Sequence, residues 1–151
     1  MTPHARYPLA MLLVALALVG PATDAAAMWA PLTDAELTDQ SDLIVVGELI
    51  GQTQVRLAPD QPRLAFGILR VDEALKGDRA RGMLLLALPS PDALRSSTDI
   101  THRPGEKGLW YLKGRAQAEG IYLADHPQRF VPANQATPRI DSLRKSLKNR
   151  P

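Results

Sequence analysis

The segment Asp42–Leu57, DLIVVGELIGQTQVRL, constrains the fold more than any other part of this chain. Its β-branched residues favour a β-strand over a helix. Side chains of a strand alternate between two faces, so Val45 and Leu49 share one face while Ile44 and Val46 share the other. Both faces are apolar at the start of the segment. The sequence therefore predicts a central strand that is covered on both sides.

Two glycines in this strand, Gly47 and Gly51, are expected positions for bends or bulges, which allow a sheet to curl into a barrel. Further strand-like segments follow at short spacing and are bounded by proline, glycine and aspartate. The pattern indicates five or six strands in a small antiparallel barrel or a strongly curled sheet. The later segments span residues 63–78, 81–91, 108–114 and 120–132.

Helices are expected only at the two ends of this strand-rich region. Thr33 and Glu36 have the spacing of a capping box, in which each side chain satisfies a backbone N–H at the helix start. This spacing predicts a short helix over residues 34–40. The last segment, residues 134–151, is expected to form an amphipathic helix with a basic outer face.

The N-terminal residues have the features of a secretory signal. Arg6 supplies a basic start, and the apolar run of residues 9–20 is shorter than the roughly 20 residues that a membrane-spanning helix needs. Small residues at Ala25–Ala27 predict cleavage after Ala27, and the alternative is an uncleaved membrane anchor. We expect a periplasmic or secreted protein. The predicted organisation is a signal peptide (1–27), an N-terminal segment with a short helix (28–41), a barrel (42–133) and a C-terminal amphipathic helix (134–151).

The chain contains no cysteine, which excludes disulfides, thiolate nucleophiles and zinc–thiolate sites. Export without cysteine suits a bacterial periplasm or cell surface better than a disulfide-stapled extracellular module. The formal net charge of +2 is too small to favour nucleic acid as a partner.

Three pieces of the sequence resemble, in this order, a loosely defined group of exported bacterial domains. They are SDLIVVGELIG (41–51), LRVDEALKGD (69–78) and PGEKGLWYLKG (104–114) with the following GIYLADHPQRFVP. The resemblance implies an OB-like barrel akin to the inhibitory domain of tissue inhibitors of metalloproteinases, over residues 41–131. The expected fold class is thus mainly β: a small five- to six-stranded antiparallel OB-like barrel with a short N-terminal helix and a C-terminal helix.

One departure from those inhibitors concerns their chemistry. Their mature N-terminal cysteine places its amine and carbonyl on the zinc of the target protease. Here the predicted mature chain starts at Met28 and no cysteine exists. We therefore do not expect protease inhibition by that chemistry.

Enzymatic or metal chemistry would have to use the two histidines that follow the signal, His102 and His126, with the nearby acids Asp99 and Asp125. The spacing of the histidines matches no recognised metal motif, and no serine lies in a G-x-S-x-G elbow. We expect no catalytic residue, metal or cofactor. A weak metal-binding protein or a hydrolase is the alternative function.

The favoured function is non-catalytic binding of a protein, a peptide or an envelope component through a strand edge or face. Contact with a membrane is expected only if the signal segment is not cleaved. Trp110 and Tyr111 point to opposite faces of one strand, so one of them could form a surface platform. The stretch Asp125–Pro127 has turn chemistry and is interpreted as the exposed bend of the last hairpin. The possible binding surface comprises Trp110, Tyr111, Tyr122, His126 and Arg129.

Overall fold

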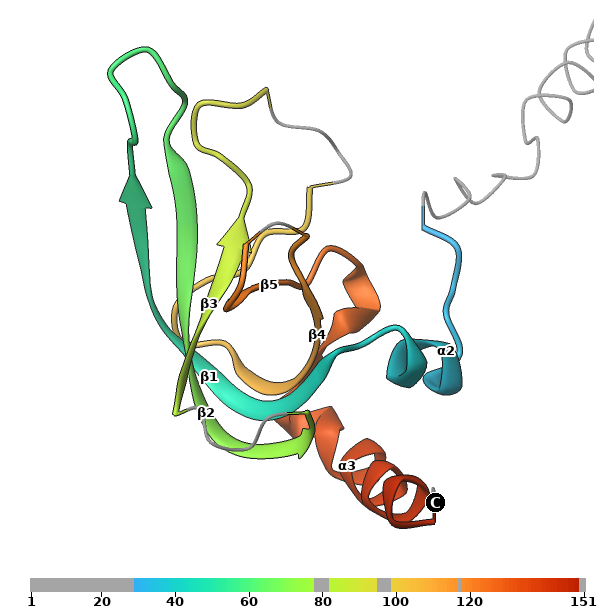
Figure 1. Ribbon diagram of the computed structural model, residues 1–151. Helices are drawn as coiled ribbons and strands as arrows, with labels where there is room; N and C mark the ends of the chain where they lie inside the picture. The colour runs from blue at the N-terminus through green and yellow to red at the C-terminus, as the bar shows by residue number, and fades with distance from the viewer. Residues whose placement is uncertain (1–28, 78–81, 95–98, 117, 150–151) are drawn as a thin grey trace, which may run out of the picture. The chain divides into compact units, whose positions relative to one another are not determined.

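Residues 29–77, 82–94, 99–116 and 118–149 are described by the computed structural model, and the elements below belong to the unit that begins at Pro31. The predicted signal peptide lies outside the described residues. Among the described residues, no helix is long and apolar enough to span a membrane. In chain order (Figure 1) the elements are α2 (Asp34–Asp39), β1 (Leu43–Val55), β2 (Leu64–Lys76), β3 (Met83–Leu88), β4 (Lys107–Gly114), β5 (Ile121–Leu123), the 3-10 helix η1 (Pro127–Arg129), β6 (Phe130–Pro132) and α3 (Ala133–Lys148).

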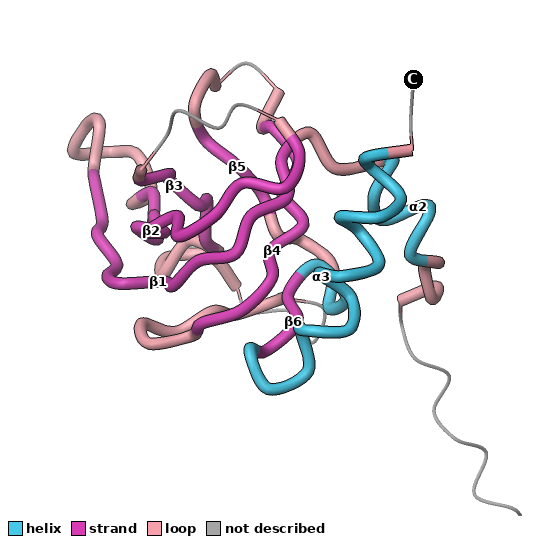
Figure 2. Tube along the Cα trace, turned by 90° about the horizontal axis from the view of Figure 1, so that it is seen from below, coloured by secondary structure: helices cyan, strands magenta, loops and turns pink. Residues whose placement is uncertain are grey.

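Five strands close into a barrel in the order β1-β2-β3-β5-β4, because β4 pairs again with β1 (Figure 2). The sixth strand, β6, lies outside this ring and pairs with β4. The β3–β5 pair is parallel and the other pairs are antiparallel. The predicted mainly β barrel with a helix at each end is confirmed, with this parallel pair as a departure from an all-antiparallel arrangement.

The predicted central strand is β1, which pairs with β2 along most of its length and with β4 over Leu43–Glu48. Its register against β2 shifts at Gly47 and again between Leu49 and Gly51, so both predicted bends are confirmed. At Gly47 an added Cβ would overlap the carbonyl oxygen of Arg70. Glycine is required there because the two backbones approach too closely for any side chain.

Two apolar clusters hold the fold, one on each face of the sheet. The cluster inside the barrel includes Val45 and Leu49, and the cluster between the barrel and the helices includes Ile44 and Val46, as the alternation in β1 predicts. The predicted capping box of α2 is present: the Thr33 hydroxyl accepts from the Glu36 N–H, and the Glu36 carboxylate accepts from the Thr33 N–H. The helix α3 packs against β4 and β6.

Candidate functional site

Trp110 and Tyr111 are both fully buried, on opposite faces of β4. The indole Nε1–H of Trp110 donates to the carbonyl of Gly47 at 3.2 Å, and its ring lies 4.3 Å from that of Phe130. Tyr111 lies in the cluster beneath the helices. The expectation that these aromatics contribute an exposed platform is wrong, because α2 and α3 cover the face that would have carried it. Tyr122 is half-buried and packs against the barrel core.

Arg129 is also buried, with 3% of its surface exposed. Its Nη1 donates to the hydroxyl of Ser41 at 3.2 Å and to the carbonyl of Tyr111 at 3.4 Å, and its Nε lies 3.3 Å from the carboxylate of Asp125. The guanidinium thus ties η1 to the start of β1 and to β4. Its predicted place on a binding surface is wrong.

The segment around His126 is not the bend of a hairpin. The strands on either side of it, β5 and β6, pair with β4 and not with each other. Because β1 occupies one edge of β4, both strands lie along the other edge, and Ala124–Arg129 is an interruption between them. His126 is buried, and its Nδ1 accepts from the N–H of Gln128 as the cap of η1. The prediction that His126 lies at an exposed loop tip is wrong.

His102 is 8% exposed, and its ring lies 4.9 Å from that of Trp110. Its Nδ1 lies 2.9 Å from a carboxylate oxygen of Glu106. The sequence did not pair these two residues, because the segment between them is a loop and has no regular period that brings side chains together. Within the described part of the chain, no group of three or more histidine, aspartate or glutamate side chains is placed to hold a metal ion.

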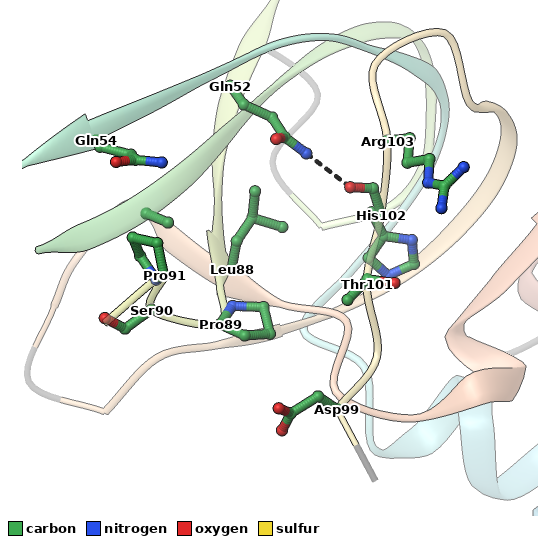
Figure 3. Close-up of a pocket in the computed structure, with 11 residues that line it drawn as sticks. Gln52, Gln54, Leu88, Pro89, Ser90, Pro91, Asp99, Thr101, His102 and Arg103 are labelled. Atoms are coloured by element: carbon green, nitrogen blue, oxygen red, sulfur yellow. Dashed lines mark hydrogen bonds between the residues drawn. The ribbon is translucent and has the colours of Figure 1, made fainter. Parts of the chain in front are cut away.

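A pocket of about 290 Å³ lies where β1, β2 and β3 extend past the barrel and face the loop before β4 (Figure 3). The side chain of Gln52 enters it from β1, and its Nε2 donates to the carbonyl of His102 at 2.6 Å. Ser90 and His102 lie on opposite sides of the pocket, so they do not form a nucleophile–base pair. The lining residues are Gln52, Gln54, Ala65, Leu88, Pro89, Ser90, Pro91, Asp99, Thr101, His102 and Arg103.

Ser90 serves a structural purpose in this pocket. Its hydroxyl donates to the carbonyl of Arg63 at 2.7 Å and accepts from the N–H of Asp92 at 3.2 Å. The carboxylate of Asp92 in turn lies 2.6 Å from the guanidinium of Arg63. The hydrogen bonds from the Arg63 side chain and backbone hold the pKa of Asp92 down at about 2. These bonds fasten the tip of the β1–β2 hairpin to the turn after β3.

Next to this pocket, the second half of β1 has an open edge. Residues Gly51–Val55 pair with β2, whereas the pairing with β4 ends at Glu48. In the described residues no strand pairs with the other edge of Gly51–Val55, so alternate residues direct N–H and C=O groups away from the sheet. The hairpin of β1 and β2 projects beyond the barrel (Figure 1), which leaves this edge accessible.

The composition of the open edge is unusual for an exposed strand. Proteins protect such edges with charged side chains, proline, β-bulges or very short strands. The segment Gly51–Val55 reads GQTQV and contains neither a charge nor a proline. The site that the structure assembles is therefore an open strand edge that follows the bulge at Gly51 and carries no charge or proline, with a mixed polar and apolar pocket beside it.

Comparison with known proteins identifies no family: no protein-family model matches the chain, and no curated protein is significantly similar to it. The functional assignment therefore depends on the geometry of the site.

Proposed function

We propose that the protein is an exported, non-catalytic binding protein that receives an extended segment of another polypeptide along the open edge of β1. The observation that carries the proposal is the unpaired edge of Gly51–Val55. A polypeptide that adds to such an edge gains main-chain hydrogen bonds, and pockets beside the edge take alternate side chains. Gln52 and Gln54 line the pocket. Residues opposite each other on paired strands direct their side chains to the same face of the sheet, so a ligand residue opposite Gln52 or Gln54 would direct its side chain toward the pocket.

The attachment of the hairpin tip supports this proposal. An edge that is already fixed in the extended conformation loses little conformational freedom when a ligand strand is added. The Arg63–Asp92 ion pair, at 2.6 Å, and the Ser90 hydrogen bonds supply this fixation. Binding then requires ordering of the ligand more than of the protein.

Export to the periplasm or beyond is part of the same proposal. It rests on the basic start, the apolar run and the small residues of the N-terminal segment. A neutral, unpaired edge in an exported protein would meet unfolded or extended segments of envelope proteins. The partner we propose is thus a protein or peptide, with no nucleic acid.

The experiment begins with peptides selected from a random display library on the purified protein. Lysines introduced by the double substitution Thr53→Lys, Val55→Lys place charges on the open edge, as natural edge strands do. We expect the affinity of the selected peptides to fall at least about tenfold. The matched control is Met83→Lys, which adds a charge at a position 66% exposed on a strand that is paired on both sides.

The Met83→Lys control distinguishes a peptide bound along the open edge of β1 from a peptide bound on the outer face of β3. Edge binding predicts that Met83→Lys leaves the affinity unchanged within about twofold. Peptides that bind the edge double variant as well as they bind the unmodified protein would contradict the proposal. Loss of binding in the Met83 variant alone would place the ligand on the outer face of β3 instead.

A further inference from the structure

The open edge of β1 has two defined ends. Its inner end follows Leu49, whose N–H donates to the carbonyl of Glu106 at 2.9 Å and whose carbonyl accepts from the N–H of Gly105 at 2.7 Å. Its outer end is Val55, where the strand stops. Between these ends, Gly51–Val55 pairs with β2 on one side, and no other described strand pairs with it. A strand that adds to this edge therefore meets a short stretch of backbone with fixed limits.

The sequence of this edge is self-complementary in an antiparallel pair. The segment GQTQV has Thr53 at its centre, so a two-fold axis at Thr53 places this residue opposite its own copy. The same axis places Gln52 opposite Gln54 of the second copy. Cross-strand threonine pairs stabilise a sheet, and each glutamine amide can donate to and accept from the other. The segment contains no charge, so no like-charge repulsion opposes the pairing.

Gly51 and Val55 also match across such a pair, in which they lie opposite each other. A Cβ placed at Gly51 would lie 3.9 Å from Ile68 Cδ1, and apart from the glycine's own neighbours in the chain no other described atom lies within 4 Å of it. Val55 is 42% exposed, and alternation along β1 directs it to the same face of the sheet as position 51. Val55 of one copy therefore fills the space beside Gly51 of the other and covers Ile68, once at each end of the paired segment.

The shape of the hairpin leaves room for a second copy. β1 and β2 project beyond the barrel (Figure 1), and the pairing of β1 with β4 stops at Glu48. In an antiparallel pair the second β1 runs in the opposite direction, so its barrel lies past the tip of the first hairpin. The two barrels are thus at opposite ends of the paired strands.

We propose that two copies of this chain form a two-fold symmetric dimer through their β1 edges, which pair antiparallel and are centred on Thr53. The dimer joins the two hairpins into one continuous sheet and pairs the backbone groups that each edge leaves open. The inference goes beyond the proposed function, because it concerns the edge when no other polypeptide occupies it. So short a segment makes a contact smaller than that of a stable interface, and we therefore expect a micromolar to millimolar dissociation constant.

The first test measures the dissociation constant of the purified protein by analytical ultracentrifugation, from micromolar to millimolar concentration and without peptide. Thr53→Lys places two ammonium groups opposite each other, and we expect it to weaken the dimer at least about fivefold. An equal mixture of Thr53→Lys and Thr53→Glu chains should dimerise within about twofold of the unmodified protein, because opposite charges then meet at the axis. The control Met83→Lys, at a position 66% exposed on a strand that is paired on both sides, should leave the dissociation constant unchanged.

The second test uses the absence of cysteine from the chain. Thr53→Cys supplies one thiol per chain, and residues directly opposite in an antiparallel pair have Cβ atoms about 5 Å apart, close to the reach of a disulfide. We expect mild oxidation to link these chains into dimers at least about tenfold faster than chains with the control Met83→Cys, because the paired thiols meet at a high effective concentration.

The inference is overturned if the protein stays monomeric up to millimolar concentration or if Thr53→Lys leaves the dimer intact. It is also overturned if the mixture of lysine and glutamate variants does not dimerise, or if both cysteine variants are oxidised at the same rate. These results leave the proposed function standing, since a monomer whose edge binds a selected peptide loses only the dimer. A dimer that forms through Thr53 and is not dissociated by the selected peptide would instead contradict the proposed function alone.

Discussion

At the scale of one residue, Arg129 was predicted to lie on a binding surface, but its side chain is buried and stabilises the fold. It is buried and donates to groups on two strands, the hydroxyl of Ser41 and the carbonyl of Tyr111. Arg129→Ala leaves both acceptors without this donor and removes packing. We predict a loss of about 3 kcal/mol in the free energy of unfolding, measured by urea denaturation. The control Arg115→Ala, at an exposed position, should change it by less than about 0.5 kcal/mol.

The Arg129 prediction separates a structural role from a binding role. A functional surface arginine would give a stable Arg129→Ala protein that has lost only its ligand. Equal stability of the Arg129 and Arg115 variants would contradict the structural assignment.

Asp92 makes stability depend on pH in a defined window. Its pKa in the folded protein is held at about 2 by hydrogen bonds from Arg63, below the ordinary value of 3.8. A group whose pKa is depressed by folding contributes stability above its unfolded pKa, and that contribution disappears as the pH falls through the folded pKa. Asp92 thus stabilises the fold fully above about pH 4 and ceases to do so near pH 2.

The matched measurement compares the melting temperatures of the unmodified protein and Asp92→Asn between pH 6 and pH 2. The unmodified protein should melt at a higher temperature near pH 6, and this advantage should shrink below about pH 4 and vanish near pH 2. An advantage that is the same at pH 2 as at pH 6 would show that the carboxylate charge of Asp92 is not involved.

At the scale of the element, β1 contains two glycines at bends, and only Gly47 is required by the close approach of a neighbouring backbone. A Cβ at Gly47 would overlap the carbonyl oxygen of Arg70, whereas the nearest atom to a Cβ at Gly51 is Ile68 Cδ1, at an ordinary 3.9 Å. We predict that Gly47→Ala lowers the free energy of unfolding by about 3 kcal/mol and that Gly51→Ala changes it by less than about 1 kcal/mol. Urea denaturation of the two variants checks this, and similar costs would mean that close approach at Gly47 does not shape the strand.

The elements that were predictable from the sequence are those with local patterns. The alternation in β1, its two bends and the capping box at Thr33 and Glu36 each depend on residues a few positions apart, and each is present in the structure. The parallel β3–β5 pair brings Leu85 beside Ile121. Such a long-range pairing has no local sequence signature, so strand order could not be predicted in the same way.

The same limit explains the errors at the predicted site. Alternation placed Trp110 and Tyr111 on opposite faces correctly, but whether a face is covered depends on where α2 and α3 pack. The turn residues at Asp125–Pro127 indicated a turn, and only the pairing of β5 and β6 with β4 shows that it is not a hairpin. The open edge also depends on long-range pairing, because it exists where β4 stops pairing with β1.

At the scale of the whole molecule, the proposed export makes a prediction about the chain's own N-terminus. When the full-length protein is expressed in a bacterium, we expect the periplasmic fraction to contain a chain that begins at Met28, since cleavage follows Ala27. Intact-mass spectrometry of that fraction measures the start of the chain. Full-length protein retained in the membrane fraction would instead support the uncleaved anchor.

The central claim for the whole molecule is that its binding site is the open edge of β1. Hydrogen exchange of the protein with and without a library-selected peptide tests it most directly, because added backbone hydrogen bonds slow the exchange of the amides that form them. We predict that the peptide slows exchange at alternate amides of Gly51–Val55 at least about tenfold, with little change in α3. Slowed exchange confined to the helices or to the outer face of β3, with Gly51–Val55 unchanged, would contradict the claim.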